Sequence, residues 1–165
     1  MDLALFLNGL DKYGMIIVFV VVFLEYLNLP GFPAGIILPC SGVWASKGHN
    51  FFITFTLTVL AGILGSLLLY FLGKYGGGKL LQFLTGKSEK AKKIYDKIEG
   101  MLEKNGMKAV FIAKLLPVAR TIVGIPAGAM NMNLKNYLTA STLGIIIWNA
   151  VLFGAGYFLG MTVVG

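Results

Sequence analysis

The sequence predicts an all-α integral membrane protein, and three observations support this fold class. Of the 165 residues, 57% are hydrophobic and only 13% are charged, whereas soluble domains contain about 45–50% apolar and about 25% charged residues. Helices are the default spanning elements, because backbone groups in lipid must be hydrogen-bonded within the segment itself. The long runs "MIIVFVVVFL" and "GIIIWNAVLF" do not alternate, as the strands of a β-barrel would.

The first part of the chain, residues 1–73, is expected to form a re-entrant helical hairpin and a transmembrane helix. Residues 13–47 are apolar but are interrupted by "PGFPAG", which contains Pro30 and Pro33. Residues 51–73 follow a polar turn and are long enough to cross a core of roughly 30 Å at about 1.5 Å per residue. This part therefore predicts one broken segment and one full span.

Residues 74–106 are the only long polar stretch of the sequence. Nine lysines lie between positions 74 and 108, against four acids, so the positive-inside rule places this segment in the cytoplasm. Attraction to anionic lipid headgroups explains the lysine excess, and we expect no nucleic-acid binding. Apolar side chains at helical spacing predict an amphipathic surface helix. Its apolar face contains Ile94, Ile98, Met101 and Leu102.

Residues 107–165 repeat the order of the first part. The apolar segment 107–132 is interrupted at Pro117 and again near Pro126, and Gly128 lies close behind the second proline. Residues 138–161 are long and apolar enough for a second full span. The two parts thus have the same order of hydropathy.

Two broken apolar segments in matching halves are typical of transporters built from inverted repeats, with a binding site near the bilayer midplane. A re-entrant segment begins and ends on one side of the membrane. Because the single span 51–73 lies between the two hairpins, they would enter from opposite faces. The halves would then be inverted copies within a single membrane domain, residues 1–165. Residues 13–29 are also long enough to cross alone, so the first segment either re-enters or spans.

Three ionisable residues lie inside the apolar segments: Glu25, Lys114 and Arg120. A charge at the centre of a spanning helix costs roughly 2.5–3.5 kcal/mol on insertion scales, so pairing or water must offset the cost of the two cations. Pro117 lies between them and breaks the helical ladder. Non-helical backbone at that depth is tolerated only where it lines a cavity or is buried in protein.

These three charges sum to +1, so we expect a hydrated cavity that attracts the phosphate of an anionic lipid. Arginine offers a fork of donors to phosphate oxygens, and lysine offers a mobile point charge. The structural alternative is that both cations extend to the membrane interface while Glu25 acts as a structural partner.

Ser66 and Asn149 are weaker candidates for the wall of this cavity, because polar residues in spanning helices serve helix packing equally well. The single cysteine, Cys40, excludes an internal disulfide and a multi-cysteine metal site, and His49 lies in a polar turn. We therefore expect no metal site and no cofactor. A membrane enzyme is disfavoured, because the sequence has no clustered carboxylates and no evident activated nucleophile.

The stretch "FIAKLLPVARTIVGIPAGAMNM" resembles the DedA family, the bacterial and archaeal branch of the SNARE-associated, VTT-domain membrane proteins. In that family a proline and arginine motif precedes an Ala-Gly-x-x-x-Met pattern, to which Pro117, Arg120, Ala127, Gly128 and Met132 are loosely similar. "LEYLNLPGFPAGIILPCSG" is similar to the family's glutamate and Pro-rich hairpin tip, and "GYFLG" to its C-terminal glycine motif. The resemblance covers residues 12–161.

The resemblance implies two facing hairpins that move lipids between leaflets, with Glu25 and Arg120 at functional positions and Lys114 where an arginine is usual. Substrates attributed to the family include undecaprenyl phosphate, a polyprenyl phosphate, and phosphatidylethanolamine. Gly35 and Ser66 stand where the family has acids, which are its candidate proton-handling groups.

The sequence thus predicts a flippase or scramblase for a phosphate-bearing lipid in the prokaryotic cytoplasmic membrane, where it supports envelope homeostasis. A small-solute or ion transporter, proton-coupled or not, is the alternative. The lipid, the direction, the driving force and the oligomeric state, a homo-oligomer included, stay open.

Overall fold

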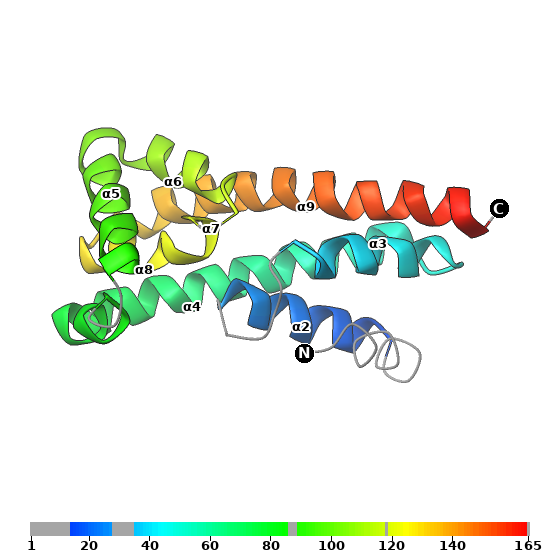
Figure 1. Ribbon diagram of the computed structural model, residues 1–165, viewed down its shortest axis with the longest axis horizontal. Helices are drawn as coiled ribbons and strands as arrows, with labels where there is room; N and C mark the ends of the chain where they lie inside the picture. The colour runs from blue at the N-terminus through cyan, green and yellow to red at the C-terminus, as the bar shows by residue number, and fades with distance from the viewer. Residues whose placement is uncertain (1–13, 28–34, 86–88, 118, 165) are drawn as a thin grey trace. The chain divides into compact units, whose positions relative to one another are not determined.

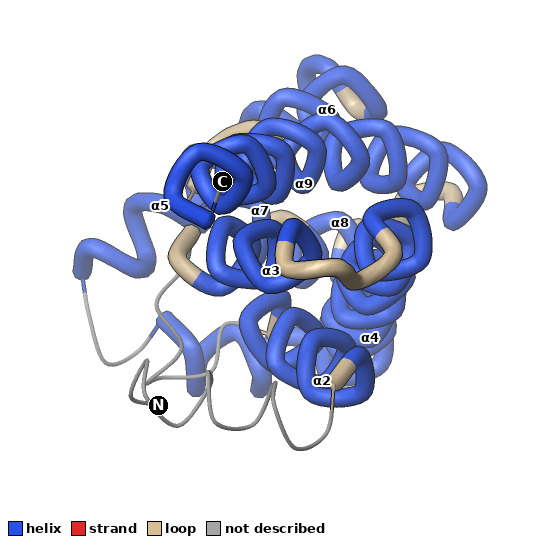
Figure 2. Tube along the Cα trace, turned by 90° about the vertical axis from the view of Figure 1, so that its right-hand side faces the viewer, coloured by secondary structure: helices blue, strands red, loops and turns tan. Residues whose placement is uncertain are grey.

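The computed structural model describes residues 14–27, 35–85, 89–117 and 119–164, and all regular elements in these ranges are helices (Figures 1 and 2). The helices are α2 (Met15–Tyr26), α3 (Ile37–Ser46), α4 (Phe51–Thr85), α5 (Glu89–Asn105), α6 (Met107–Lys114), α7 (Ala119–Ile122), α8 (Gly124–Ala129) and α9 (Leu134–Val164). Pro30 and Pro33, predicted to break the first apolar segment, lie outside the described residues. The all-α prediction is confirmed for the described part of the chain.

Two helices are long and apolar enough to cross a membrane, at Phe51–Gly76 in α4 and Leu134–Thr162 in α9. They lie where the two spans are predicted, with different ends. α9 begins at Leu134 rather than 138. α4 continues to Thr85, well beyond residue 73, because its three consecutive glycines weaken a helix by only about 1 kcal/mol each and no proline follows to stop it.

The chain forms two compact units, each of which receives part of both long helices. The first unit comprises residues 1–64 and 146–165, and the second comprises residues 65–145. The first therefore contains α2, α3, the beginning of α4 and the end of α9. The second contains the remainder of α4, helices α5 to α8, and the beginning of α9.

Helix α5 belongs to the core of the second unit. Ile98 and Leu102 are buried in a cluster with residues of α4, α6, α8 and α9, and Met101 packs against the same cluster. In Figure 1, α5 runs from beside α8 to beside α6, and it contacts both helices. The predicted amphipathic helix is confirmed, but its apolar face covers protein rather than lipid, because the short helices α6 to α8 leave apolar side chains for it to bury. Ile94 is not among the described side chains.

Glycine allows α8 to approach α4 closely in the second unit. A Cβ added to Gly128 would overlap the carbonyl oxygen of Tyr70, and a Cβ added to Gly73 would overlap that of Ile125. Each glycine therefore faces a backbone carbonyl of the opposite helix. Such small-residue contacts let helix backbones pack against each other in membranes.

The first unit shows the same arrangement between α3 and α9. A Cβ at Gly42 would overlap the carbonyl oxygen of Phe153, and a Cβ at Gly156 would overlap that of Pro39. In both units, the carbonyl residue precedes the glycine by three positions on each helix. At these two helix contacts, α3 with α9 and α8 with α4, there is no room for a residue larger than glycine.

Candidate functional site

The second apolar segment folds as a broken helix, as predicted. α6 ends at Lys114, and α7 begins at Ala119. The amides of Leu115 and Leu116 bond three residues back, at 3.0 and 3.1 Å, which tightens the end of α6. Pro117 follows in the break and is exposed. A second interruption falls at Val123, and Pro126 lies three positions later inside the first turn of α8, where its missing N–H has no helical acceptor to lose.

Lys114 is buried at the end of α6, with 1% of its surface exposed. Its Nζ donates to Ser66 Oγ at 2.7 Å and to the carbonyl oxygen of Arg120 at 2.8 Å. The same Nζ lies 5.9 Å from the centroid of the Tyr137 ring, within range of a cation–π interaction. Residues from α4, α7 and α9 therefore surround this ammonium group.

Arg120 is the largest fully buried side chain of the described residues, with 0% exposed. It lies in α7, next to the buried Thr121. Its amide donates to the carbonyl oxygen of Leu116 at 2.9 Å, and its own carbonyl accepts from Lys114. The break thus lets the Lys114 side chain bond the backbone of Arg120.

Lys114 and Arg120 are the buried charged side chains described in the second unit. The acids described there, Asp96, Glu99 and Glu103, lie on α5 at exposed or half-buried positions. The alternative in which both cations extend to the interface is wrong, since neither side chain reaches solvent. Their burial is a cost that the surrounding structure has to offset.

Glu25 belongs to the first unit, where it is 2% exposed near the end of α2. Its Oε1 accepts a hydrogen bond of 3.2 Å from the amide of Gly35. Gly35 has φ +94°, a conformation that glycine adopts without steric cost. Gly35, which stands where the family has an acid, therefore donates its backbone N–H to Glu25. The convergence of Glu25 with Lys114 and Arg120 stays a prediction.

Ser66 and Asn149, the two candidates for the cavity wall, have different surroundings. Ser66 accepts from Lys114, and its carbonyl accepts from Tyr137 Oη at 3.0 Å. Asn149 accepts from Tyr26 Oη at 2.8 Å and donates to Thr58 Oγ1 at 3.3 Å. Asn149 therefore joins α2, α4 and α9 within the first unit.

Tyr137 is a site residue that the sequence analysis missed. It is fully buried, its hydroxyl bonds Ser66 and its ring lies near Lys114. Its position at the start of an apolar span resembles that of an interfacial tyrosine, so the sequence contains no signal that separates the two roles.

Ser66→Ala should destabilise the protein, because it removes a partner from a buried ammonium group. Hydrogen bonds to charged groups contribute about 1.5–3 kcal/mol. Ser41→Ala is the matched control, since Ser41 is also buried but bonds only the carbonyl of Ile37 in its own helix. Thermal unfolding in detergent measures both, and an equal loss in the two variants would contradict the role given to Ser66.

Comparison with known proteins identifies the family. The VTT-domain model matches residues 32–158. Undecaprenyl phosphate transporter A of Staphylococcus aureus is 32% identical over 145 residues, covering 85% of this chain and 71% of that protein. Protein DedA of Escherichia coli K12 is 29% identical over 158 residues, covering 90% and 71%.

Another relative carries a different kind of name. The alkaline phosphatase-like protein of Lactococcus lactis subsp. cremoris is 28% identical over 157 residues, covering 92% of this chain and 73% of that protein. No solved structure matches the chain. The family model covers most of the chain, and the two spans predicted from sequence are present as helices. The chain therefore belongs to the DedA family of VTT-domain membrane proteins.

Proposed function

We propose that this protein moves a phosphate-bearing lipid, a polyprenyl phosphate or a phospholipid, between the leaflets of the prokaryotic cytoplasmic membrane, and so supports envelope homeostasis. The observation that carries the proposal is the burial of Lys114 and Arg120 on either side of a helix break. Buried ionisable groups in membrane segments are costly and mark substrate pathways. The relationship to a protein named undecaprenyl phosphate transporter A supports the same substrate class.

The donor chemistry of the site suits a phosphate. An ammonium group has three N–H donors, and those of Lys114 include one bound to Ser66 and one bound to the Arg120 carbonyl. The third donor is proposed to bind a phosphate oxygen. The guanidinium group of Arg120 would bind other oxygens of the same phosphate in a fork. Ser66 keeps the ammonium group in place beside Arg120.

Re-entrant, inverted repeats are part of the proposal. The matching glycine and carbonyl contacts, α3 with α9 and α8 with α4, support two equivalent halves. Pro117 and Pro126 would shape the second hairpin, with Pro30 and Pro33 in the corresponding tip of the first. Residues 74–106 would be cytoplasmic, since this segment carries most of the lysines.

Glu25 is proposed to line the transport path and to balance one cation when no lipid is bound. A carboxylate beside a cation favours the charged state of both groups. If this is correct, Glu25→Gln should leave the cations more attractive to phosphate and slow the release of the lipid. Faster release from that variant would contradict the role.

Reconstitution into liposomes tests the proposal. Translocation of a labelled polyprenyl phosphate, and separately of labelled phosphatidylethanolamine, should exceed that of empty liposomes. Flux of soluble anions with no lipid movement would instead show a small-solute or ion transporter. Phosphate release from the lipid by the pure protein would indicate an enzyme, the possibility raised by the alkaline phosphatase-like relative.

A further inference from the structure

A groove with a polar end and apolar lining lies in the second unit, outside the buried residues of α6. It is a groove of about 860 Å³ between the end of α5, α6 and the beginning of α9. Its lining residues are Lys104, Asn105, Met107, Lys108, Phe111, Ile112, Ala140 and Leu143. We name it the α5–α6–α9 groove. None of the three charged residues of the proposed transport site belongs to it.

The two faces of α6 explain this separation. Val110, Ala113 and Lys114 are buried, whereas Lys108 and Ile112 are exposed. Residues four positions apart share a face of a helix, so Lys108 and Ile112 lie together on the outer side. Gly144 of α9 meets Lys114, while its neighbour Leu143 remains 49% exposed in the groove.

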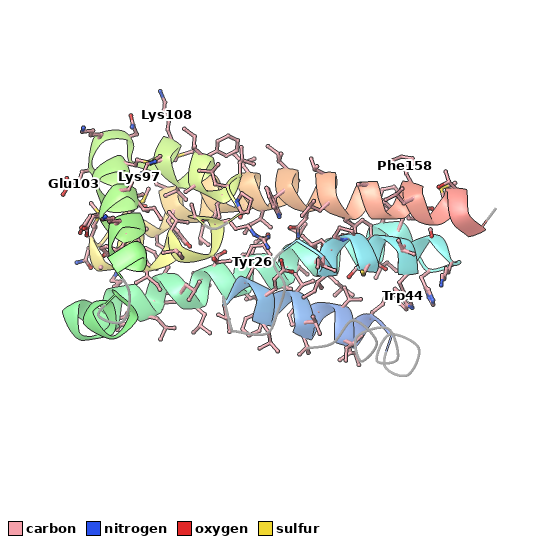
Figure 3. The ribbon with its side chains drawn as sticks, in the orientation of Figure 1. Tyr26, Trp44, Lys97, Glu103, Lys108 and Phe158 are labelled. Atoms are coloured by element: carbon pink, nitrogen blue, oxygen red, sulfur yellow. The ribbon has the colours of Figure 1, made fainter. Side chains whose placement is uncertain are left out.

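The groove has a polar end and an apolar floor. Lys104, Asn105 and Lys108 are exposed and lie around the turn that joins α5 to α6. Figure 3 shows Lys108 projecting outward at the start of α6, whereas Glu103 projects from α5 in a different direction. Ile112 and Leu143, which are 47% and 49% exposed, form part of the floor. Leu143 lies within the stretch of α9 that is apolar enough to span, so we expect the floor to face hydrocarbon.

We propose that the α5–α6–α9 groove binds an anionic glycerophospholipid of the leaflet that borders the lysine-rich segment. The two ammonium groups complement the phosphodiester, and the Asn105 amide can bond a headgroup hydroxyl. Phe111, Ile112 and Leu143 cover one acyl chain. Basic pockets between membrane helices bind lipid headgroups in this way. This bound lipid is distinct from the transported one, and the proposal does not depend on transport.

Native mass spectrometry of the detergent-purified full chain tests the proposal. The probes are phosphatidylglycerol and phosphatidylcholine with identical acyl chains, added at matched concentrations. Phosphatidylglycerol should bind more tightly. The double variant Lys104→Ala, Lys108→Ala should weaken its binding about 30-fold, which corresponds to about 1 kcal/mol for each lysine. Equal binding of the two lipids, or unchanged binding to the double variant, would overturn the proposal.

A charge-matched control separates a site from a diffuse positive surface. Lys93→Ala with Lys135→Ala removes the same charge from exposed positions of α5 and α9 that do not line the groove. This control should bind phosphatidylglycerol nearly as well as the unaltered protein. An equal loss in both double variants would show general surface attraction and would overturn the site.

The apolar floor has its own test. Leu143→Trp fills the groove while keeping both lysines, and should weaken phosphatidylglycerol binding. Leu68→Trp is the control, because Leu68 is a similarly exposed leucine on α4 outside the groove. Thermal unfolding confirms that each variant is folded. A species of twice the mass without lipid, lost in Leu143→Trp, would show that a second copy occupies the groove and would overturn the lipid assignment.

Discussion

Arg120→Ala should lower the rate of lipid-phosphate translocation in liposomes by about 10- to 100-fold. Hydrogen bonds to charged groups contribute about 1.5–3 kcal/mol, and about 1.4 kcal/mol changes an equilibrium tenfold. Arg120 is the only arginine in the sequence, so no second guanidinium group can replace it. The measurement is the initial rate of translocation of a labelled polyprenyl phosphate, normalised to the reconstituted protein.

Companion variants separate the loss of the fork from the loss of charge. Arg120→Lys keeps the positive charge but cannot bind two oxygens in a planar fork, so its rate should lie between those of Arg120→Ala and the unaltered protein. Lys114→Met removes the other cation at similar length. Lys93→Ala, an exposed lysine on α5, should have no effect. An unchanged rate in a folded Arg120→Ala protein would remove the proposed phosphate site.

The single arginine also permits a chemical test. Phenylglyoxal reacts selectively with guanidinium groups, so arginine labelling of this chain reports on Arg120 alone. The side chain is fully buried in the described state. Transport requires the site to open, so we expect slow labelling that added polyprenyl phosphate suppresses. Labelling that is equally fast with and without the lipid would contradict binding at this residue.

Gly128→Ala should cause a large loss of stability, lowering the unfolding temperature in detergent by about 5–10 °C. The added Cβ would overlap the carbonyl oxygen of Tyr70. Backbone cannot move aside as a flexible side chain can, so α8 would have to separate from α4. Movement of α8 would also disturb the short connection to α7, which carries Arg120.

Gly154→Ala is the matched control on α9. A Cβ at Gly154 meets nothing within 4 Å, and alanine in a helix interior is favoured over glycine by about 0.5–1 kcal/mol. This variant should therefore be as stable as the original or slightly more stable. Gly42→Ala, in the first unit, should be destabilised to a similar extent as Gly128→Ala. Tolerance of Gly42→Ala with intolerance of Gly128→Ala would contradict equivalent halves.

Much of the architecture could be predicted from local sequence features. Hydropathy located both long apolar helices, because a run of apolar residues has a stable place in lipid whatever its neighbours are. The break at Pro117 was also predictable, since proline lacks the N–H that a helix interior needs. The extension of α4 to Thr85 was not, because glycine weakens a helix without ending it.

The sequence by itself determined that this is a helical membrane protein with two cations inside a broken apolar segment. Only the tertiary structure decided what surrounds them: Ser66 of α4 and the Arg120 carbonyl as acceptors for Lys114, with the Tyr137 ring nearby. It also decided that the apolar face of α5 covers α6 and α8. The physical reason is that these partners are far apart in the sequence, and one of them is a backbone carbonyl that every residue type possesses. Helix packing selects such contacts, and neither hydropathy nor periodicity encodes them.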